Sequence, residues 1–232
     1  MIDWHTHILP GMDDGSHDVA ESISMINMQV SQGVDTVIAT PHFYANDETV
    51  DSFLRRRDRS MELLKAQLPD GAPAIRLGAE VRYYQGISRM SELKALQIEG
   101  SKLLLLEMPM SSWTEYMLRE LVDLSGKNSS KIVLAHMERY LNLQKQAVWE
   151  RIFDSGILMQ VNASFLTDFA SKRKAISLLR EGKIHFVGSD CHNTTSRAPK
   201  IGRAFEVIRK KLGDDYINQM NDYGHSMITT SN

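Results

Sequence analysis

The 232-residue sequence contains a single cysteine, Cys191, so no disulfide can form within the chain. Lys and Arg number 27 against 29 Asp and Glu, which leaves a net charge of -2 and none of the basic excess typical of nucleic-acid-binding proteins. The longest apolar runs cover only four residues, as at Leu103–Leu106, far short of the ~20 that cross a bilayer. No Gly-rich nucleotide loop is present. The composition therefore excludes an internal disulfide framework and a membrane span, and argues against nucleic-acid binding.

Short runs rich in Val, Ile and Leu alternate along the chain with longer amphipathic segments. This alternation is typical of parallel strands connected by helices. One helix is expected over Val19–Gln32, where apolar residues recur on one face, and another after Pro199. Seven strands are expected, at Ile2–His7, Val34–Thr40, Ile75–Glu80, Leu103–Glu107, Ile132–His136, Leu158–Asn162 and Ile184–Ser189. No linker interrupts this series, so we expect residues 1–232 to form a single domain.

Polar residues at the strand ends distinguish a closed barrel from an open sheet, which periodicity alone does not. Six of the seven expected strands end in a metal-binding residue type or lead to one within three positions. These residues are His5 and His7, His42, Glu80, Glu107, His136, and Asp190 with His192. In α/β barrels the carboxyl ends of the strands converge on one face. The sequence therefore predicts an α/β, TIM-like barrel with its site at that face.

Two short motifs place paired ligands at the first and last strands. In His5-Thr6-His7, the period-two alternation of a strand puts both imidazoles on the same side. Asp190-Cys191-His192 repeats this spacing after the last strand. An isolated His-x-His is about as often a pair of ordinary polar residues as a metal site. Two such pairs, brought together by a barrel, favour metal ligation.

Further acidic and imidazole groups follow the other strands. Glu80 and Glu107 each end an apolar strand, where an unpaired buried carboxylate is costly and a cation would offset the cost. His42 and His136 follow their own strands, and each alone could be a core histidine hydrogen-bonded to the backbone. Asp13-Asp14-Gly15 adds carboxylates to the same rim or is simply an Asp-Gly turn.

The candidate ligands number nine, whereas one ion takes only about three or four from a protein. They are His5, His7, Asp14, His42, Glu80, Glu107, His136, Asp190 and His192. We therefore expect two or three divalent ions. Imidazole and carboxylate ligands without thiolate suit Mn, Fe or Zn. Neighbouring ions can supply a hydroxide nucleophile and neutralise a transferring phosphoryl group, so phosphoester hydrolysis is the predicted chemistry.

Two arginines follow the last histidines closely, Arg139 three residues after His136 and Arg197 five after His192. Both would lie on the metal-binding rim and could bind phosphate oxygens, or each could form a surface salt bridge. Cys191 and Arg197 also have the Cys-x5-Arg spacing of thiol-dependent phosphatases. That alternative is disfavoured, because the stretch between them has no glycine for a phosphate-binding loop and Cys191 would point away from the ion that its neighbours face.

Four motifs, in order along the chain, match a known family. The segments Ile2–Gly15, Gly78–Glu80, Ala135–Arg139 and Ser189–Asn193 resemble the polymerase and histidinol phosphatase (PHP) superfamily. More narrowly, the chain resembles the bacterial PHP-type tyrosine-protein phosphatases of capsule and exopolysaccharide operons, the CpsB/YwqE group. The resemblance implies a distorted seven-stranded (β/α)7 barrel that binds three metal ions, with Mn as the first candidate.

The same resemblance implies a role for each candidate residue. A first ion would be held by His5, His7, Glu80 and Asp190, a second by Glu80, Glu107 and His136, and a third by Asp14, His42 and His192. Asp14, rather than Asp13, is the implied ligand. Arg139 and Arg197 match arginines that bind the substrate phosphate.

These observations lead to the hypothesis of a metal-dependent protein-tyrosine phosphatase in which a metal-bound hydroxide attacks phosphorus. The resemblance implies that its partner is the Tyr-rich tail of a bacterial tyrosine kinase that regulates exopolysaccharide synthesis. A histidinol-phosphate-type small-molecule phosphatase and a non-catalytic metal-bound scaffold are the alternatives. The chain opens without a secretory-type segment, so we expect a cytoplasmic location. The polar end, Asp222–Asn232, lacks the apolar closing helix that the resemblance would imply, which leaves the packing of this last segment open.

Overall fold

The computed structural model describes residues 1–126 and 130–229. The strands are β1 (Ile2–Thr6), β2 (Thr36–Ala39), β3 (His42–Phe43), β4 (Ala74–Leu77), β5 (Glu80–Arg82), β6 (Leu103–Glu107), β7 (Lys131–Leu134), β8 (Leu158–Asn162) and β9 (Phe186–Gly188). The α-helices are α1 (Val19–Ser31), α2 (Val50–Lys65), α3 (Glu115–Ser125), α4 (Gln146–Asp154), α5 (Ala163–Thr167), α6 (Lys172–Arg180), α7 (Ile201–Leu212) and α8 (Asp214–Ile228). Short 3-10 helices are η1 (Ile87–Arg89), η2 (Ser91–Leu96) and η3 (Met137–Tyr140). None of the helices in the described ranges is both long and apolar enough to span a membrane.

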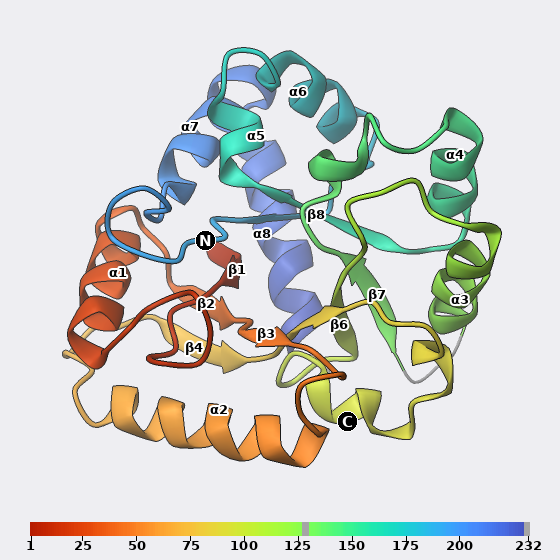
Figure 1. Cartoon of the computed structure of the whole chain (residues 1–232). Helices are drawn as coiled ribbons and strands as arrows, with labels where there is room; N and C mark the ends of the chain where they lie inside the picture. Colours follow the sequence, from red (N-terminus) through yellow and green to blue (C-terminus); the bar gives the residue numbers. More distant parts are fainter. Residues whose placement is uncertain (127–129, 230–232) are drawn as a thin grey trace.

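The strands pair in parallel and form a curled sheet. Their order is β1-β2-β4 in one part and β3-β5-β6-β7-β8-β9 in the other. Beyond β9 the chain passes alongside β1, where the Asp190 N–H donates to the His5 carbonyl at 2.8 Å and the His7 N–H to the Cys191 carbonyl at 3.0 Å. Figure 1 shows the strands gathered at the centre with α1 to α4 around the outside. The predicted α/β class with a parallel, curled sheet is confirmed.

One expected strand is interrupted, and another is followed by a further short strand. The expected strand Ile75–Glu80 breaks at Gly78-Ala79, between β4 and β5. The expected strand Val34–Thr40 contains β2, and Thr40-Pro41 separates β2 from β3. Proline has no N–H to donate to a neighbouring strand. At Gly78 an added Cβ would lie 3.1 Å from Ile98 Cγ1, so the chain passes close to its neighbour there. The halves still pair in step, β2 with β4 and β3 with β5, but the expected count of seven strands is not confirmed.

Apolar side chains pack on both faces of the sheet. One cluster lies among the strands and includes Ile2, Leu105 and Trp4, whose ring stacks on Phe186 with centroids 3.9 Å apart. A larger cluster joins the strands to the outer helices. Burying one such large apolar side chain contributes about 1.5–3 kcal/mol. The strand ends that carry the polar residues are therefore fixed by apolar packing on either face.

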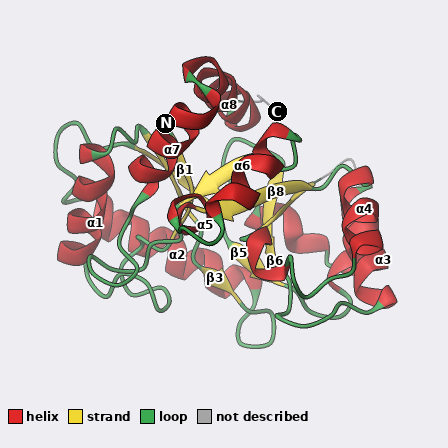
Figure 2. Cartoon of the chain, turned by 90° about the horizontal axis from the view of Figure 1, so that it is seen from above, coloured by secondary structure: helices red, strands yellow, loops and turns green. Residues whose placement is uncertain are grey.

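The C-terminal helix α8 packs against the strands on one side of the sheet. Its Ile228 belongs to the cluster among the strands, and Gly224 lies so close to Trp4 that an added Cβ would be 3.1 Å from the indole. Figure 2 shows α8 at one side of the strands, next to α7. The structure settles the packing of the polar end as far as Ile228, because a narrow buried stripe is enough to dock a largely polar helix. Residues 230–232 lie outside the described residues.

Candidate metal centre

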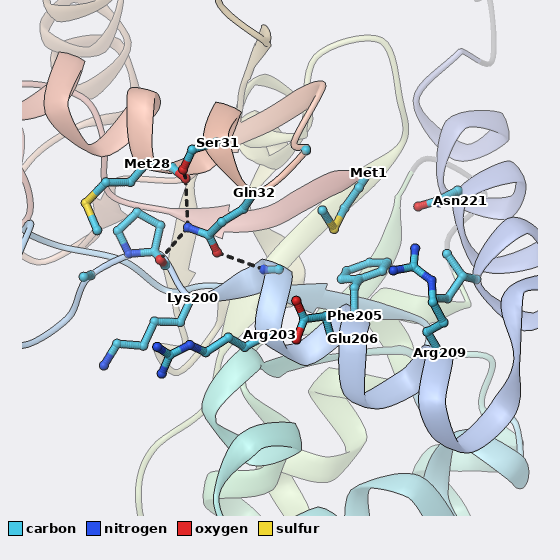
Figure 3. Close-up of a pocket in the computed structure, with 15 residues that line it drawn as sticks. Met1, Met28, Ser31, Gln32, Lys200, Arg203, Phe205, Glu206, Arg209 and Asn221 are labelled. Carbon is cyan, nitrogen blue, oxygen red and sulfur yellow. Dashed lines mark hydrogen bonds between the residues drawn. The ribbon is translucent and has the colours of Figure 1, made fainter.

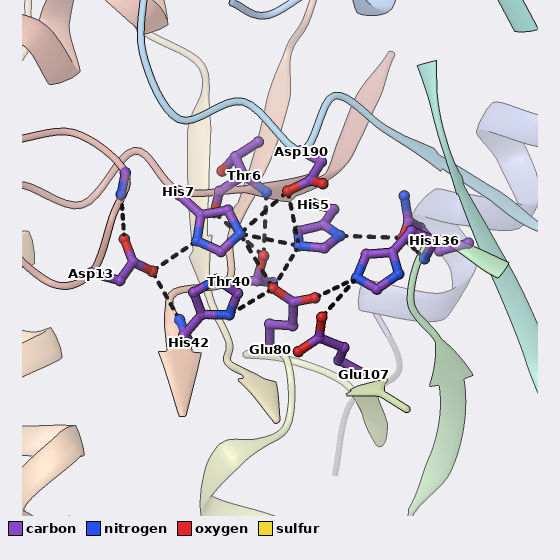
Figure 4. Close-up of polar contacts among 12 residues, drawn as sticks. His5, Thr6, His7, Asp13, Thr40, His42, Glu80, Glu107, His136 and Asp190 are labelled. Carbon is purple, nitrogen blue, oxygen red and sulfur yellow. Dashed lines mark hydrogen bonds and ion pairs between the residues drawn. The ribbon is translucent and has the colours of Figure 1, made fainter. Parts of the chain in front are cut away.

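The residues predicted as ligands converge at the carboxyl ends of the strands (Figure 4). His5 Nε2 lies 3.2 Å from His7 Nε2, and Glu80 Oε2 lies 3.2 Å and 3.4 Å from these two atoms. Asp190 Oδ1 approaches the same two nitrogens at 3.7 Å and 3.5 Å. These four side chains are almost completely buried. The His-x-His pair from the first strand and the carboxylate after the last one therefore meet, as the barrel prediction required.

Glu80 connects this group to a second one. Its other oxygen, Oε1, lies 2.8 Å from His136 Nε2, and Glu107 Oε1 lies 3.6 Å from the same nitrogen. Glu80 Oε2 also lies 3.0 Å from His42 Nδ1. One carboxylate thus reaches both groups with different oxygens, which is the arrangement of a bridging ligand.

A third group lies on the more exposed side. Asp14 Oδ1 lies 3.4 Å from His42 Nε2 and 3.3 Å from His192 Nε2. The rings of His7 and His192 are 3.9 Å apart, so this group adjoins the first. In the described part of the chain, three sets of ligand atoms lie within 4.8 Å of one another: His7, Asp14, His42 and His192; His5, His7 and Asp190; and His42, Glu80 and Glu107.

The histidines are oriented by fixed acceptors behind them. His7 Nδ1 donates to Asp13 Oδ2 at 2.7 Å, and His192 Nδ1 to the Asp190 carbonyl at 3.0 Å. Tyr140 donates its proton to the Met108 carbonyl at 2.9 Å, so at 3.3 Å its oxygen accepts from His136 Nδ1. In each case the proton is on Nδ1, and Nε2 is left to face the cluster. Such supporting hydrogen bonds are typical of metal-binding histidines.

Strand β8 orients His5 through a chain of amides. Gln160 Oε1 accepts the His136 backbone N–H at 2.7 Å and must therefore also accept from His5 Nδ1 at 3.2 Å. Its Nε2 then donates to Asn162 Oδ1 at 3.0 Å, and Asn162 Nδ2 donates to Asp190 Oδ2 at 2.8 Å. The backbone N–H of His136 thus sets the donor and acceptor of every hydrogen bond in this series.

Neither Gln160 nor Asp13 was singled out for this supporting role from the sequence. The strand Leu158–Asn162 ends without a strong ligand, and Asp13 was separated from Asp14 only by the family resemblance. The structure places Asp13 behind His7, where its carboxylate also accepts the backbone N–H groups of His42 and Gly15, each at 2.9 Å. The signal that could have identified Gln160 is its polarity, since a polar side chain on the inner face of a buried strand needs a hydrogen-bond partner there.

Without bound ions, burial and the neighbouring charges shift the pKa values of the cluster's side chains in opposite directions. Burial works to raise the pKa of Glu80, but His5, His136 and His42 hold it well below its usual value. Burial works to lower the pKa of His7, yet Asp13 and Glu80 raise it to about 10. Because bound ions replace such protons, metal binding at this site is expected to depend on pH.

The residues present fit a centre for divalent ions. His42 Nδ1 and His192 Nε2 are buried and make no well-aligned hydrogen bond among the described residues, although Glu80 Oε2 and Asp14 Oδ1 lie 3.0 Å and 3.3 Å away, so an ion between these atoms would satisfy both. The donors are imidazole nitrogens and carboxylate oxygens without thiolate. The non-glycine residues with positive φ in the described ranges are His136, at 33°, and Asp190, at 52°. Backbone conformations of this kind concentrate at functional sites.

Both predicted arginines lie beside the cluster, held by the same carboxylate. Arg139 Nη2 donates to Asp190 Oδ2, and Arg197 Nη2 donates to Asp190 Oδ1 at 2.9 Å. Their side chains remain 34% and 40% exposed, so both can reach a ligand from solvent. Cys191 is fully buried, and burial raises the pKa of its thiol far above the usual value. A thiolate nucleophile at Cys191 is incompatible with this environment.

Fold and site together define an α/β protein with a candidate multinuclear metal centre at the strand ends of a curled parallel sheet. The model of the CpsB/CapC family of capsular polysaccharide synthesis matches residues 1–227, and this chain belongs to that family. The predicted family membership is confirmed.

Named relatives are similar over almost the whole chain. Tyrosine-protein phosphatase YwqE of Bacillus subtilis is 32% identical over 93% of this chain and 86% of its own length. Tyrosine-protein phosphatase CpsB of Streptococcus agalactiae serotype III is 30% identical over 95% of this chain and 94% of its own. A crystal structure from work on YwqE and Streptococcus pneumoniae CpsB, described as unique metal-dependent tyrosine phosphatases, matches with a TM-score of 0.84 and 27% identity, covering 100% of this chain and 96% of that one.

Proposed function

We propose that this protein is a metal-dependent protein-tyrosine phosphatase, a phosphomonoesterase that releases phosphate from phosphotyrosine. The observation that carries the proposal is the position of Glu80, whose two oxygens face two different groups of histidines beside two exposed arginines. The relatives named tyrosine-protein phosphatases support this activity over a histidinol-phosphate-type activity.

The proposed cofactors are three divalent ions, with Mn first and Fe or Zn as alternatives. The first would be held by His5, His7, Glu80 and Asp190, the second by Glu80, Glu107 and His136, and the third by Asp14, His42 and His192. Three overlapping sets of ligand atoms support a multinuclear centre. Ions of this kind supply an activated water at neutral pH and neutralise charge on the phosphoryl oxygens.

The protein's own side chains bind and orient the substrate. Arg139 and Arg197 present guanidinium groups from one side of the cluster, and Asp190 fixes both of them. Guanidinium groups bind phosphate oxygens through paired hydrogen bonds. Hydrolysis breaks the bond between phosphorus and the phenolic oxygen, with water supplying the new oxygen on phosphorus. Because a phenol has a pKa of about 10, the leaving oxygen needs little help from a general acid.

The finer features of the hypothesis belong to the same proposal. Residues 1–232 would form one catalytic domain, a distorted seven-stranded barrel in which β2 with β3 and β4 with β5 each count as one broken strand. The substrate would be the Tyr-rich tail of a tyrosine kinase in the cytoplasm. The continuous pairing across both breaks supports the barrel.

The test compares phosphate release from a phosphotyrosine peptide and from histidinol phosphate. We expect turnover of the peptide, its loss on chelation, and its return when Mn is restored. His136→Ala should remove activity, while the surface variant Asp70→Asn should not. A folded, metal-loaded protein that releases no phosphate would support the scaffold alternative. Preferential turnover of histidinol phosphate would support the small-molecule alternative.

A further inference from the structure

A second group of cations lies beside the phosphate-binding arginines. A pocket of about 410 Å³ has Arg139, Asp190 and Arg197 in its wall, so it opens directly onto the metal centre. Lys200 and Arg203, from the start of α7, line the same pocket. They also line a neighbouring pocket between α1 and α7, where Figure 3 shows their side chains extending in a common direction, away from Arg209. The two residues thus form a ridge next to the site.

The charges in this pocket are poorly balanced. Four cationic and two acidic side chains line it, although the whole chain has a net charge of -2. Both oxygens of Asp190 already bind Arg139 and Arg197, so Asp190 does not neutralise the ridge. Among the described residues, no ion pair is found for Lys200 or Arg203, in contrast to Arg209 farther along α7, which binds Asp214 at 2.7 Å. Asp168 also lines this pocket and Glu206 the neighbouring one, but neither forms an ion pair with Lys200 or Arg203 in the described structure, so the ridge is open to an external anion.

The beginning of α7 adds to this positive potential. Peptide dipoles make a helix N-terminus positive, so acidic residues are favoured there and cations are not. The first turn of α7 has no acidic residue and carries Arg203, three residues after Lys200 at the N-cap, whereas α8 begins with Asp214 and Asp215. Cations at this end of the helix lower the stability of the free protein. Such a cost is expected where a negatively charged partner binds.

We propose that Lys200 and Arg203 form a subsite for acidic side chains that flank the phosphotyrosine in a polypeptide substrate. The proposal rests on the proposed function, because it takes Arg139 and Arg197 as the phosphate-binding pair. Extended peptides advance about 3.3 Å per residue, so carboxylates within a few positions of the phosphotyrosine can reach the same pocket. Hydroxyl groups of Ser164, Thr167 and Ser196 complete a polar lining suited to carboxylates rather than apolar side chains.

Binding of non-hydrolysable phosphonate peptides tests the subsite without relying on turnover. Two peptides are compared, one with Glu and one with Gln at the positions flanking the phosphotyrosine analogue, by fluorescence anisotropy with the metal-loaded full chain. We expect the wild type to bind the Glu peptide about fivefold more tightly, the size expected of two exposed ion pairs. Lys200→Gln with Arg203→Gln should reduce this preference to less than twofold. Lys200→Glu with Arg203→Glu should favour a Lys-flanked peptide instead.

A matched control lies on the same helix. Lys210→Gln with Lys211→Gln removes the same charge from exposed positions at the far end of α7 and should keep the fivefold preference. Equal binding of both peptides by the wild type, or an undiminished preference in the Lys200 and Arg203 variant, would overturn the subsite. Failure of the proposed function is separate, since it appears as the absence of phosphate release from every phosphotyrosine peptide whatever the binding preference.

Discussion

The carboxylate of Asp13 joins the first and third groups of the metal centre without facing the cluster itself. Its Oδ2 lies 2.7 Å from His7 Nδ1 and 2.9 Å from the backbone nitrogen of His42. Because a carboxylate only accepts, the His7 proton is fixed on Nδ1 and its Nε2 is free to bind an ion. We therefore predict that Asp13 positions two candidate metal ligands, His7 just after β1 and His42 on β3.

Replacing Asp13 with Asn is predicted to weaken metal binding about 10- to 100-fold, the usual effect of losing such a supporting residue. Asparagine keeps the shape of the side chain but loses its charge, and its N–H₂ group would face N–H groups that now donate to Asp13. Competition with a chelator of known affinity measures the change, and far-ultraviolet circular dichroism should stay near that of the wild type. Asp70→Asn, at an exposed loop, is the control. Unchanged metal affinity would contradict this role of Asp13.

The amide chain on β8 makes a second prediction, which two variants separate. Gln160→Met removes the acceptor of His5 Nδ1–H and should allow that proton to move to Nε2. Asn162→Ala removes the bonds to Gln160 Nε2 and Asp190 but keeps Gln160 Oε1 held by the His136 N–H, so it should leave the His5 tautomer unchanged. Imidazole nitrogen shifts in NMR spectra of the metal-free protein distinguish the tautomers. The same tautomer mixture in both variants would show that Gln160 does not fix His5.

Cys191→Ser is predicted to retain phosphatase activity, because the thiol is buried and Asp190 and His192, not Cys191, face the cluster. The substitution buries a hydroxyl where a thiol packed, so the free energy of unfolding should fall by about 1–3 kcal/mol. Activity per folded molecule and urea unfolding are measured together. Loss of activity in a folded, metal-loaded Cys191→Ser protein would restore the thiol mechanism.

Glu120 on α3 anchors the loop before η1, and its effect on stability should depend on pH. Its carboxylate accepts from Tyr83 Oη at 2.7 Å, the Gly86 N–H at 3.1 Å and Ser88 Oγ at 3.0 Å. Burial works to raise the pKa of Glu120, but these bonds outweigh it and lower the pKa below its ordinary 4.5. The stabilisation is therefore present above pH 4.5 and is lost as the pH falls through the folded-state pKa.

Glu120→Gln should lower the free energy of unfolding by about 1–3 kcal/mol near neutral pH, because one acceptor oxygen becomes a donor facing donors. Urea unfolding across the pH range measures the difference from the wild type, which should shrink below pH 4.5. Asp123→Asn, at an exposed position on the same helix, is the comparison. If the difference in the free energy of unfolding between the wild type and Glu120→Gln grows in acid, this role of Glu120 is contradicted.

Much of the fold was predictable because its signals are local. The alternation of apolar runs and amphipathic segments identified the parallel α/β architecture, and the period of two placed His5 and His7 on one side of a strand. The break of the expected strand Ile75–Glu80 at Gly78-Ala79 and the short strand β3 beyond Pro41 were not predicted, since strands of two to four residues are too short to show a periodic pattern. The sequence left the packing of the chain's end open because Ile217, Gly224 and Ile228 form only a narrow buried stripe in the largely polar helix α8.

The sequence by itself determined which chemical groups stand at the strand ends, because residue type and strand alternation are local properties. Only the tertiary structure decided how those groups are held. Gln160 meets His5 across 155 residues, and Arg139 meets Asp190 across 51. Such partners are chosen by the curling of the sheet, which brings together strand ends far apart in the chain. The proton positions of the histidines and the common anchor of the two arginines follow from that geometry.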